Sequence, residues 1–331
     1  ITERVQSKIF NGSSIPASFL LIGMPGLEDV YGWISIPFSL MFLTSFVGNG
    51  TIVLLVNREP SLQQPMYILL SMLAFTDLSV SLTTLPTMLS IFWLNSTQIY
   101  LESCLTQMYF LHTFAAMESG VLVAMAVDRF IAICDPLRYA TILTNSVTAK
   151  VGLVIATRGI CIVFPIPFLT RRFPYCKSHR LSHSYCLHQD VIRLACADTT
   201  VNSLYGLIAV LLTKGLDSMF IIISYGTILQ TVLSIKGNDA RVKALSTCVC
   251  HVCAVLLFYV PLIGLSVVHR FGKHASPLLP VLMADVYLLV PPVINPVIYS
   301  IKTKQIRQKI PNVFSTRKVG GLDRRIFTIK P

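Results

Sequence analysis

Seven long apolar runs leave this chain few folds that it could adopt. A helix needs roughly 20 mostly apolar residues to cross a hydrocarbon core about 30 Å thick. Hydrophobic residues make up 53% of the 331 residues and charged residues only 13%, a composition that excludes a soluble protein. The sequence therefore predicts an all-α membrane protein, a seven-transmembrane helix bundle. The expected spans are Trp33–Val56, Met66–Trp93, Leu105–Val127, Val147–Leu169, Leu204–Ile235, Ala244–Val268 and Leu278–Ser300.

The basic residues near the span ends predict the orientation of the bundle. Lys and Arg accumulate on the cytoplasmic side of membrane proteins, and here they are more numerous on the side that holds Arg58, Arg138 and the tail after the seventh span. We therefore expect the N-terminus outside and the C-terminus in the cytoplasm. The net charge of +12 is then explained by the basic residues on the cytoplasmic side, which set the orientation and contact anionic lipid. It does not indicate nucleic-acid binding. Two N-glycosylation sequons, at Asn11 and Asn95, both fall outside in this orientation.

The chain shows no internal repeat and no linker, so we expect one heptahelical domain over residues 1–301, with an extracellular N-terminal segment, and a cytoplasmic tail over 302–331. In that tail, Ile306 and Ile310 are spaced four apart among basic residues. This spacing predicts a short amphipathic helix at the membrane surface, stopped by Pro311.

Four of the nine cysteines lie in outer segments, where oxidising conditions allow disulfide bonds. They are Cys104, Cys176, Cys186 and Cys196, and four cysteines permit three pairings. Span 6 contains a further cluster, Cys248 to Cys253, that could be mistaken for a metal site. On a helix, positions 248 and 250 point about 200° apart, so both cannot bind one ion, and we interpret these residues as small packing groups.

Several ionisable residues fall inside the predicted spans, where an uncompensated charge costs at least about 2.5 kcal/mol. The carboxyl groups of Asp77 and Glu118 are expected either to share a cation or to be protonated and hydrogen-bonded. Lys214 and Asp217 are three residues apart and thus on one helix face, so a mutual ion pair is the simplest interpretation. The alternative is an inward-pointing Lys214 that could bind an anion. Arg158 and Asp285 are also within spans.

Six motifs occur in order at characteristic places in the spans. One is the Asp128-Arg129 pair at the inner end of span 3, within Met125–Cys134. The others are Gly48-Asn49, Pro65-Met66-Tyr67, Ser224-Tyr225, the opening of span 6 at 243–248, and 292–299 in span 7.

With these motifs, the chain resembles the odorant-receptor branch of the G-protein-coupled receptors from Phe19 to about Lys309. Three further segments, 23–28, 183–186 and 268–272, resemble the class I branch, which often recognises carboxylic acids.

The resemblance implies a multi-pass plasma-membrane receptor and not an enzyme. Its ligand would be a small carboxylic acid, and it would activate a stimulatory, olfactory-type G protein to raise cAMP. It also implies two disulfide bonds, Cys104 to Cys186 and Cys176 to Cys196.

The switch implied by the resemblance lies at the cytoplasmic end. Asp128 would hold Arg129 at rest, and Arg129 would then be released toward Tyr225, while Tyr299 changes partners as span 7 bends. Phe130 replaces the Tyr that usually follows this Arg. The resemblance also places Asp77, Glu118 and Asn295 in a polar pocket that could hold Na⁺, and we expect no other cofactor.

The implied ligand pocket lies among the outer halves of spans 3 to 6, beneath the second outer loop. Arg270 would bind the carboxylate through two charge-assisted hydrogen bonds, with Ser266 one turn below it. The alternative for Arg270 is a side chain that extends to the membrane surface. The remaining candidates are the polar residues His112, His188 and Gln189 and the wall residues Phe110, Val163, Ile166, Gly206, Val210 and Leu262.

Two other functions are consistent with part of this pattern. One is the same fold with a neutral odorant as its ligand. The other is a membrane transporter, which also buries charged residues but would show a doubled pattern of broken helices from inverted repeats, and none is evident in the sequence.

Overall fold

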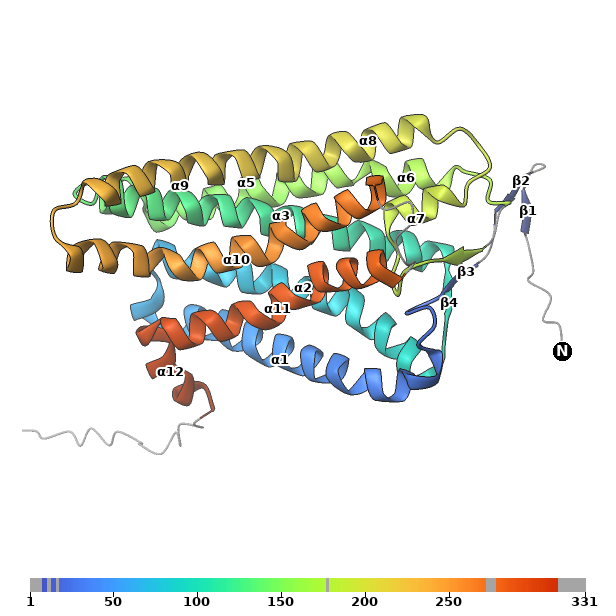
Figure 1. Ribbon diagram of the computed structural model, residues 1–331, viewed down its shortest axis with the longest axis horizontal. Coiled ribbons are helices and arrows are strands. Elements are labelled where there is room, and N and C mark those ends of the chain that lie inside the picture. Colours follow the sequence, from blue (N-terminus) through green and yellow to red (C-terminus); the bar gives the residue numbers. More distant parts are fainter. Residues whose placement is uncertain (1–7, 11–12, 16–17, 177–178, 272–277, 315–331) are drawn as a thin grey trace, which may run out of the picture.

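Long helices that run side by side along one axis make up most of the protein (Figure 1). The computed structural model describes residues 8–10, 13–15, 18–176, 179–271 and 278–314, without the side chains of 8–10, 13–15, 243, 247, 266–271, 302, 304 and 311–314. Seven of the described helical segments are long and apolar enough to cross a membrane. The predicted seven-transmembrane bundle is confirmed, and the span boundaries differ from the predicted ones by a few residues.

The spans are built from nine α-helices and one π-helical turn. Two spans are composite, because the fourth joins α5 to α6 and the fifth joins α8, the π-helical η3 and α9. The bounds of the span elements are α1 (Tyr31–Arg58), α2 (Pro65–Leu94), α3 (Leu101–Cys134), α5 (Asn145–Val163), α6 (Pro165–Arg171), α8 (Thr200–Val210), η3 (Leu211–Gly215), α9 (Leu216–Ser234), α10 (Asn238–Phe271) and α11 (Leu278–Lys302). The short helices are η1 (Glu28–Val30), η2 (Pro60–Leu62), α4 (Tyr139–Ile142), α7 (His188–Arg193) and α12 (Lys304–Phe314).

Local sequence signals set where several helices begin and end. Pro65 and Pro165 occupy the first positions of α2 and α6, where a missing N–H costs nothing. Thr144 caps α5 by accepting a hydrogen bond from the backbone N–H of Val147. Asn95 adopts a left-handed conformation with φ of 51° and ends α2. The Asn95 side chain is exposed.

The fifth span contains the π-helical turn η3, which includes both Thr213 and Lys214. A π turn inserts an extra residue into the helical repeat and changes the direction of the side chains that follow it. Lys214 and Asp217, on opposite sides of the boundary between η3 and α9, therefore do not share a face as they would on a regular α-helix. The composition of the span gives no sign of this turn.

Helix α3 occupies the centre of the bundle. In its membrane-crossing window 67% of the residues are buried, against 22% for the fourth and fifth spans. Polar residues on α3 can therefore reach several neighbouring helices at once. Gln107 near its outer end donates to the Thr83 carbonyl and the Thr87 hydroxyl of α2 at 3.0 and 2.8 Å.

A small sheet and two disulfide bonds organise the outer end. Strand β3 (Ser18–Leu21) pairs antiparallel with β4 (Gln98–Tyr100) and parallel with β5 (Arg180–Leu181), and the separate hairpin of β1 (Lys8–Phe10) and β2 (Ser13–Ile15) precedes them. The structure contains both disulfide bonds that the resemblance implies, Cys104–Cys186 and Cys176–Cys196. The first joins α3 to the second outer loop, and Gln107 also accepts a hydrogen bond from the Cys186 N–H at 2.9 Å.

The cytoplasmic end carries the predicted short helix as α12, which lies near the inner end of α1 (Figure 1). Ile306 is buried, and Lys309 Nζ lies 2.8 Å from Glu59 Oε2 at the end of α1. The predicted stop at Pro311 is wrong, because the helix continues to Phe314. A proline removes only one backbone N–H, and this loss leaves the final turn helical.

Helices α1 and α11 approach closely where α1 carries a glycine. A Cβ atom added at Gly48 would lie 2.9 Å from Pro296 Cβ, a distance that real Cβ atoms essentially never show. One residue further along, Asn49 Nδ2 donates to the Pro292 carbonyl oxygen at 2.8 Å. Pro296 cannot rotate away, so the absence of a side chain at Gly48 is a requirement of this packing.

We predict that Gly48→Ala lowers the melting temperature of the purified protein, because the added methyl group overpacks the contact at a cost of about 1–3 kcal/mol. Gly50→Ala is the matched control, since a Cβ at Gly50 meets no atom within 4 Å. The control should melt at or slightly above the melting temperature of the unmodified protein, as alanine favours the helix. Equal melting temperatures for the two variants would contradict the close contact.

Candidate functional site

A cavity of about 430 Å³ lies in the outer half of the bundle, below α7 and the second outer loop. Its walls come from α3, the fourth and fifth spans, α10 and α11. Eight residues that the sequence analysis assigned to a ligand pocket line it: His112, Val163, Ile166, His188, Gln189, Gly206, Val210 and Leu262.

Phe110 does not line the cavity, so its assignment to the wall is wrong. Its side chain is 44% exposed on the outside of the bundle, where lipid would contact it. The inward face of α3 at this level is formed by Leu111, His112 and Ala115. Because successive residues on a helix point about 100° apart, Phe110 points away when Leu111 points inward. The side chains of Ser266 and Arg270 lie outside the described residues, although their backbone belongs to the last turns of α10.

The outer end of the cavity is covered by His188 at the start of α7. His188 Nε2 lies 2.8 Å from Asn202 Oδ1 on α8, and Asn202 Nδ2 in turn donates to the Thr170 hydroxyl at 3.3 Å. Since the Asn202 oxygen accepts, His188 Nε2 carries the proton. Gly206 lets the imidazole sit against α8, because a Cβ there would lie 2.7 Å from His188 Cε1.

Burial lowers the pKa of His188 below its usual range, and the hydrogen bond to Asn202 opposes this shift only in part. The imidazole is therefore neutral at pH 7. A neutral, firmly bonded histidine positions α7 over the cavity rather than adding positive charge to it.

The inner end of the cavity is formed by Thr213 and Lys214 of η3 together with Tyr287 of α11. Lys214 Nζ donates to the Tyr287 hydroxyl and lies 4.7 Å from the centre of the Tyr287 ring and 5.5 Å from that of Phe258. The predicted ion pair between Lys214 and Asp217 is wrong. Of the two arrangements that the sequence left open, the structure has the inward-pointing Lys214.

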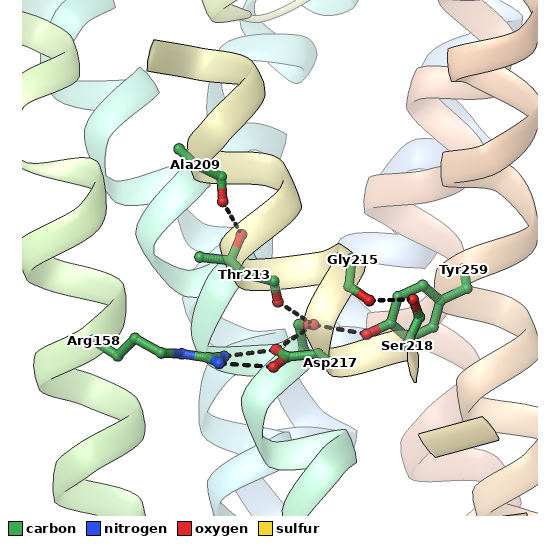
Figure 2. A network of polar contacts seen from close by, with 8 residues as sticks. Arg158, Ala209, Thr213, Gly215, Asp217, Ser218 and Tyr259 are labelled. Carbon is green, nitrogen blue, oxygen red and sulfur yellow. Dashed lines mark hydrogen bonds and ion pairs between the residues drawn. The ribbon is translucent and has the colours of Figure 1, made fainter. Parts of the chain in front are cut away.

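Asp217 is paired instead with Arg158 of α5, below the cavity (Figure 2). Arg158 Nη1 and Nη2 donate to the two Asp217 oxygens at 2.7 and 2.6 Å, which is the two-pronged geometry of a strong Arg–carboxylate pair. The Asp217 side chain is 3% exposed and that of Arg158 is 30% exposed. The sequence analysis noted both charges but missed their pairing; opposite charges in consecutive spans were the available signal.

Ser119 of α3 connects this ion pair to the π turn η3 and to α10. Its hydroxyl oxygen lies 2.8 Å from Asp217 Oδ2, 2.9 Å from the Thr213 carbonyl oxygen and 2.8 Å from the Tyr259 hydroxyl oxygen on α10. With its single proton Ser119 donates to one of the first two acceptors, while Tyr259 can donate to it. One buried serine thus ties α3, the fifth span and α10 together at one depth.

A second polar cluster contains the predicted cation ligands. Asn295 Nδ2 donates to Asp77 Oδ2 at 2.9 Å, and Asp77 also interacts with Glu118. Among the described residues, the buried atoms Asp77 Oδ1, Glu118 Oε1 and Asn295 Oδ1 have no hydrogen-bond partner. Two carboxyl groups and an amide oxygen with spare acceptor capacity are a donor set that suits a hard cation such as Na⁺.

Asp128 and Arg129 lie in contact at the cytoplasmic end of α3. Arg129 Nε lies 3.7 Å from Asp128 Oδ2, and Tyr139 of α4 donates to Asp128 Oδ1 at 2.7 Å. Burial and this bond raise the pKa of Tyr139, so its phenol stays protonated as a donor. The Tyr that usually follows this Arg is Phe130 in this chain. Asp128 has a phenol partner from the following loop, Tyr139.

Tyr225 is held by a residue that the sequence analysis did not single out. Its hydroxyl lies 2.6 Å from His251 Nδ1 of α10, and the two rings stack with centres 5.7 Å apart. The Tyr299 hydroxyl is buried and has no hydrogen-bond partner among the described residues. In this arrangement Arg129 and Tyr225 each have their own partner.

Comparisons with known proteins agree with this architecture. A family model described as olfactory receptor matches residues 38–317. Human olfactory receptor 51G2 is 55% identical over 304 residues, which cover 92% of this chain and 97% of that protein. Human olfactory receptor 51E2 is 52% identical over 298 residues, covering 90% and 93%. The crystal structure of squid rhodopsin has the same fold, with a TM-score of 0.70, 17% identity and coverage of 87% and 86%.

We predict that Arg158→Met and Asp217→Leu each destabilise the protein by about 3 kcal/mol, because each leaves the partner charge inside the bundle without its counter-ion. The double variant should recover most of this loss, since both charges are then absent. Melting temperature in detergent and surface labelling in cells are the measurements.

Lys214→Met combined with Asp217→Leu is the matched control, and it should give no such recovery because Lys214 is not bonded to Asp217. Additive destabilisation in the Arg158 and Asp217 double variant would contradict the ion pair.

Proposed function

The chain belongs to the olfactory receptor family of G-protein-coupled receptors, and from that premise we propose that it binds a small carboxylic acid in the outer cavity and raises cAMP through a stimulatory, olfactory-type G protein. Membership of the family establishes the general properties of the protein. The protein is a multi-pass receptor of the plasma membrane, its partners are an odorant and a G protein, and it is not an enzyme.

The observation that carries the proposal is the distribution of polar groups in the cavity. Its side walls are apolar, with Val163, Ile166 and Leu262 among them, and suit an aliphatic chain. Polar side chains face it at the two ends. His112 Nε2 and the Tyr185 hydroxyl belong to lining residues, are buried and have no hydrogen-bond partner among the described residues. An oxygen-rich ligand would give these groups the partners that they lack.

Arg270 is the proposed anchor for the carboxylate. Arg270 belongs to the outer end of α10. Leu262 and Leu265, one to two turns further inward on the same helix, line the cavity. A guanidinium in a partly dehydrated site can make two charge-assisted hydrogen bonds to a carboxylate. A neutral odorant could accept only a weaker, single hydrogen bond from this group, so the size of the contribution of Arg270 separates the two kinds of ligand.

The proposed route of activation begins directly below the ligand. Thr213 lines the cavity, and its carbonyl contacts Ser119, which also contacts Tyr259 of α10. A ligand that changes these contacts changes the restraint on α10. An outward movement of α10 would separate His251 from Tyr225 and allow Tyr225 to meet Arg129.

The cluster of Asp77, Glu118 and Asn295 is proposed to bind Na⁺ in the resting receptor. Support comes from the three buried oxygens without partners and from the net negative charge that two ionised carboxylates would carry without a cation. Bound Na⁺ would offset one of these two negative charges and hold α2, α3 and α11 together.

We predict that Arg270→Ala weakens the cAMP response to linear carboxylic acids about 10- to 100-fold, the value of one charge-assisted interaction. Arg172→Ala is the matched control, because Arg172 is an exposed arginine on the same side of the membrane. It should leave the response unchanged once surface expression is normalised. An unchanged acid response in Arg270→Ala would favour a neutral ligand instead.

We also predict that Na⁺ raises the melting temperature of the purified receptor relative to K⁺ at the same ionic strength. At a concentration tenfold above its Kd, Na⁺ would stabilise the folded state by about 1.4 kcal/mol. Asp77→Asn should abolish this difference, whereas Asp239→Asn, at an exposed cytoplasmic position, should preserve it. A sodium effect that persists in Asp77→Asn would rule out this site.

A further inference from the structure

Lys214 is placed at the inner end of the ligand cavity, opposite the end covered by α7. Gly206 packs against His188 at the outer end, and Lys214 follows eight residues later in the same span. At 1.5 Å of rise per residue this corresponds to roughly 12 Å along the helix axis. The two polar ends of the cavity are thus separated by about the length of a medium aliphatic chain.

The amine of Lys214 has aromatic partners but no ion-paired carboxylate. It donates to the Tyr287 hydroxyl and lies over the rings of Tyr287 and Phe258. The ion pairs formed within the described part of the chain do not include it. Glu118 interacts with the amine electrostatically but beyond ion-pair distance, and it belongs to the cluster around Asp77.

Asp217, the nearest acidic residue along the chain, already has hydrogen-bond partners for both of its carboxylate oxygens. Both of its oxygens accept from Arg158, and one also contacts Ser119. Aromatic rings stabilise a cation by about 0.5–2 kcal/mol, less than a buried charge costs. The positive charge at the cavity floor is therefore only partly compensated by the protein itself.

We propose that Lys214 is a second anion-binding group of the cavity, so that the receptor prefers α,ω-dicarboxylic acids over monocarboxylic acids with the same carbon chain. This inference rests on the proposed function for the first carboxylate, which the outer end of the cavity binds. The second carboxylate reaches the floor and accepts from the Lys214 amine. Tyr287, whose hydroxyl oxygen accepts from Lys214, keeps its own proton for the same carboxylate.

The geometry also sets a length requirement. The ligand chain must cross the apolar middle of the cavity, past Ala115 and Leu262, before its far end meets Lys214. A diacid that is too short leaves its second carboxylate among apolar side chains, where an unpaired charge is costly. Potency should therefore rise to a maximum along a series from adipic to dodecanedioic acid rather than increase steadily.

The test is a cAMP dose–response series of linear diacids and matched monoacids in cells that express the receptor, normalised by surface labelling. The best diacid should be about 10- to 100-fold more potent than its matched monoacid, the range of one charge-assisted hydrogen bond. Lys214→Met should abolish this preference, so that the potency ratio of each diacid to its matched monoacid falls to about one. Lys214→Gln, which keeps a donor without the charge, serves as a second variant should the first reach the surface poorly.

Lys150→Met is the matched control, since it removes an exposed lysine near the cytoplasmic start of α5. It should retain the diacid preference. Monoacid responses without any diacid preference, or a preference that survives in both Lys214 variants, would overturn this inference and leave the proposed function standing. A receptor that responds to no acid of either series would overturn both.

Discussion

The ion pair between Arg158 and Asp217 determines how charge is distributed through the outer half of this receptor. Either group alone inside a bilayer would be costly, and their two short hydrogen bonds hold α5 against the fifth span. Because Asp217 is neutralised in this way, Lys214 is left to face the cavity. The same aspartate fixes Ser119 and, through it, Tyr259 of α10. The cavity floor and the restraint on α10 therefore share one structural cause.

This arrangement gives the proposed signal a short physical path. Tyr259 and His251 are eight residues apart on α10, roughly 12 Å along the helix axis. The first contacts Ser119 below the ligand, and the second holds Tyr225 near the cytoplasmic side. A rigid helix that loses its restraint at Tyr259 would displace His251 with it. The free energy needed is modest, because each contact is a single hydrogen bond.

Much of the fold could be predicted from the sequence, because the decisive signals are local. Apolar run length defines the spans, Lys and Arg define the orientation, and cysteines in outer segments mark the disulfide bonds whose pairing the family resemblance supplied. The errors arose where the spacing of residues along the chain does not determine the direction in which their side chains point. The π turn at η3 separated Lys214 from Asp217, and a shift of one residue placed Phe110 outside the bundle while Leu111 and His112 face the cavity. Partners from distant segments, such as Arg158 for Asp217 and His251 for Tyr225, depend on helix packing that the sequence does not encode locally.

The central claim is that the outer cavity recognises a carboxylate and that this recognition activates the receptor. The most direct measurement is the cAMP response of cells expressing the unmodified receptor to linear carboxylic acids and to the alcohols of the same chain lengths. Recognition of the carboxylate predicts that the acids activate and that the matched alcohols are inactive or at least about tenfold weaker, as expected for loss of a charge-assisted interaction. Alcohols that activate as strongly as the acids would contradict it.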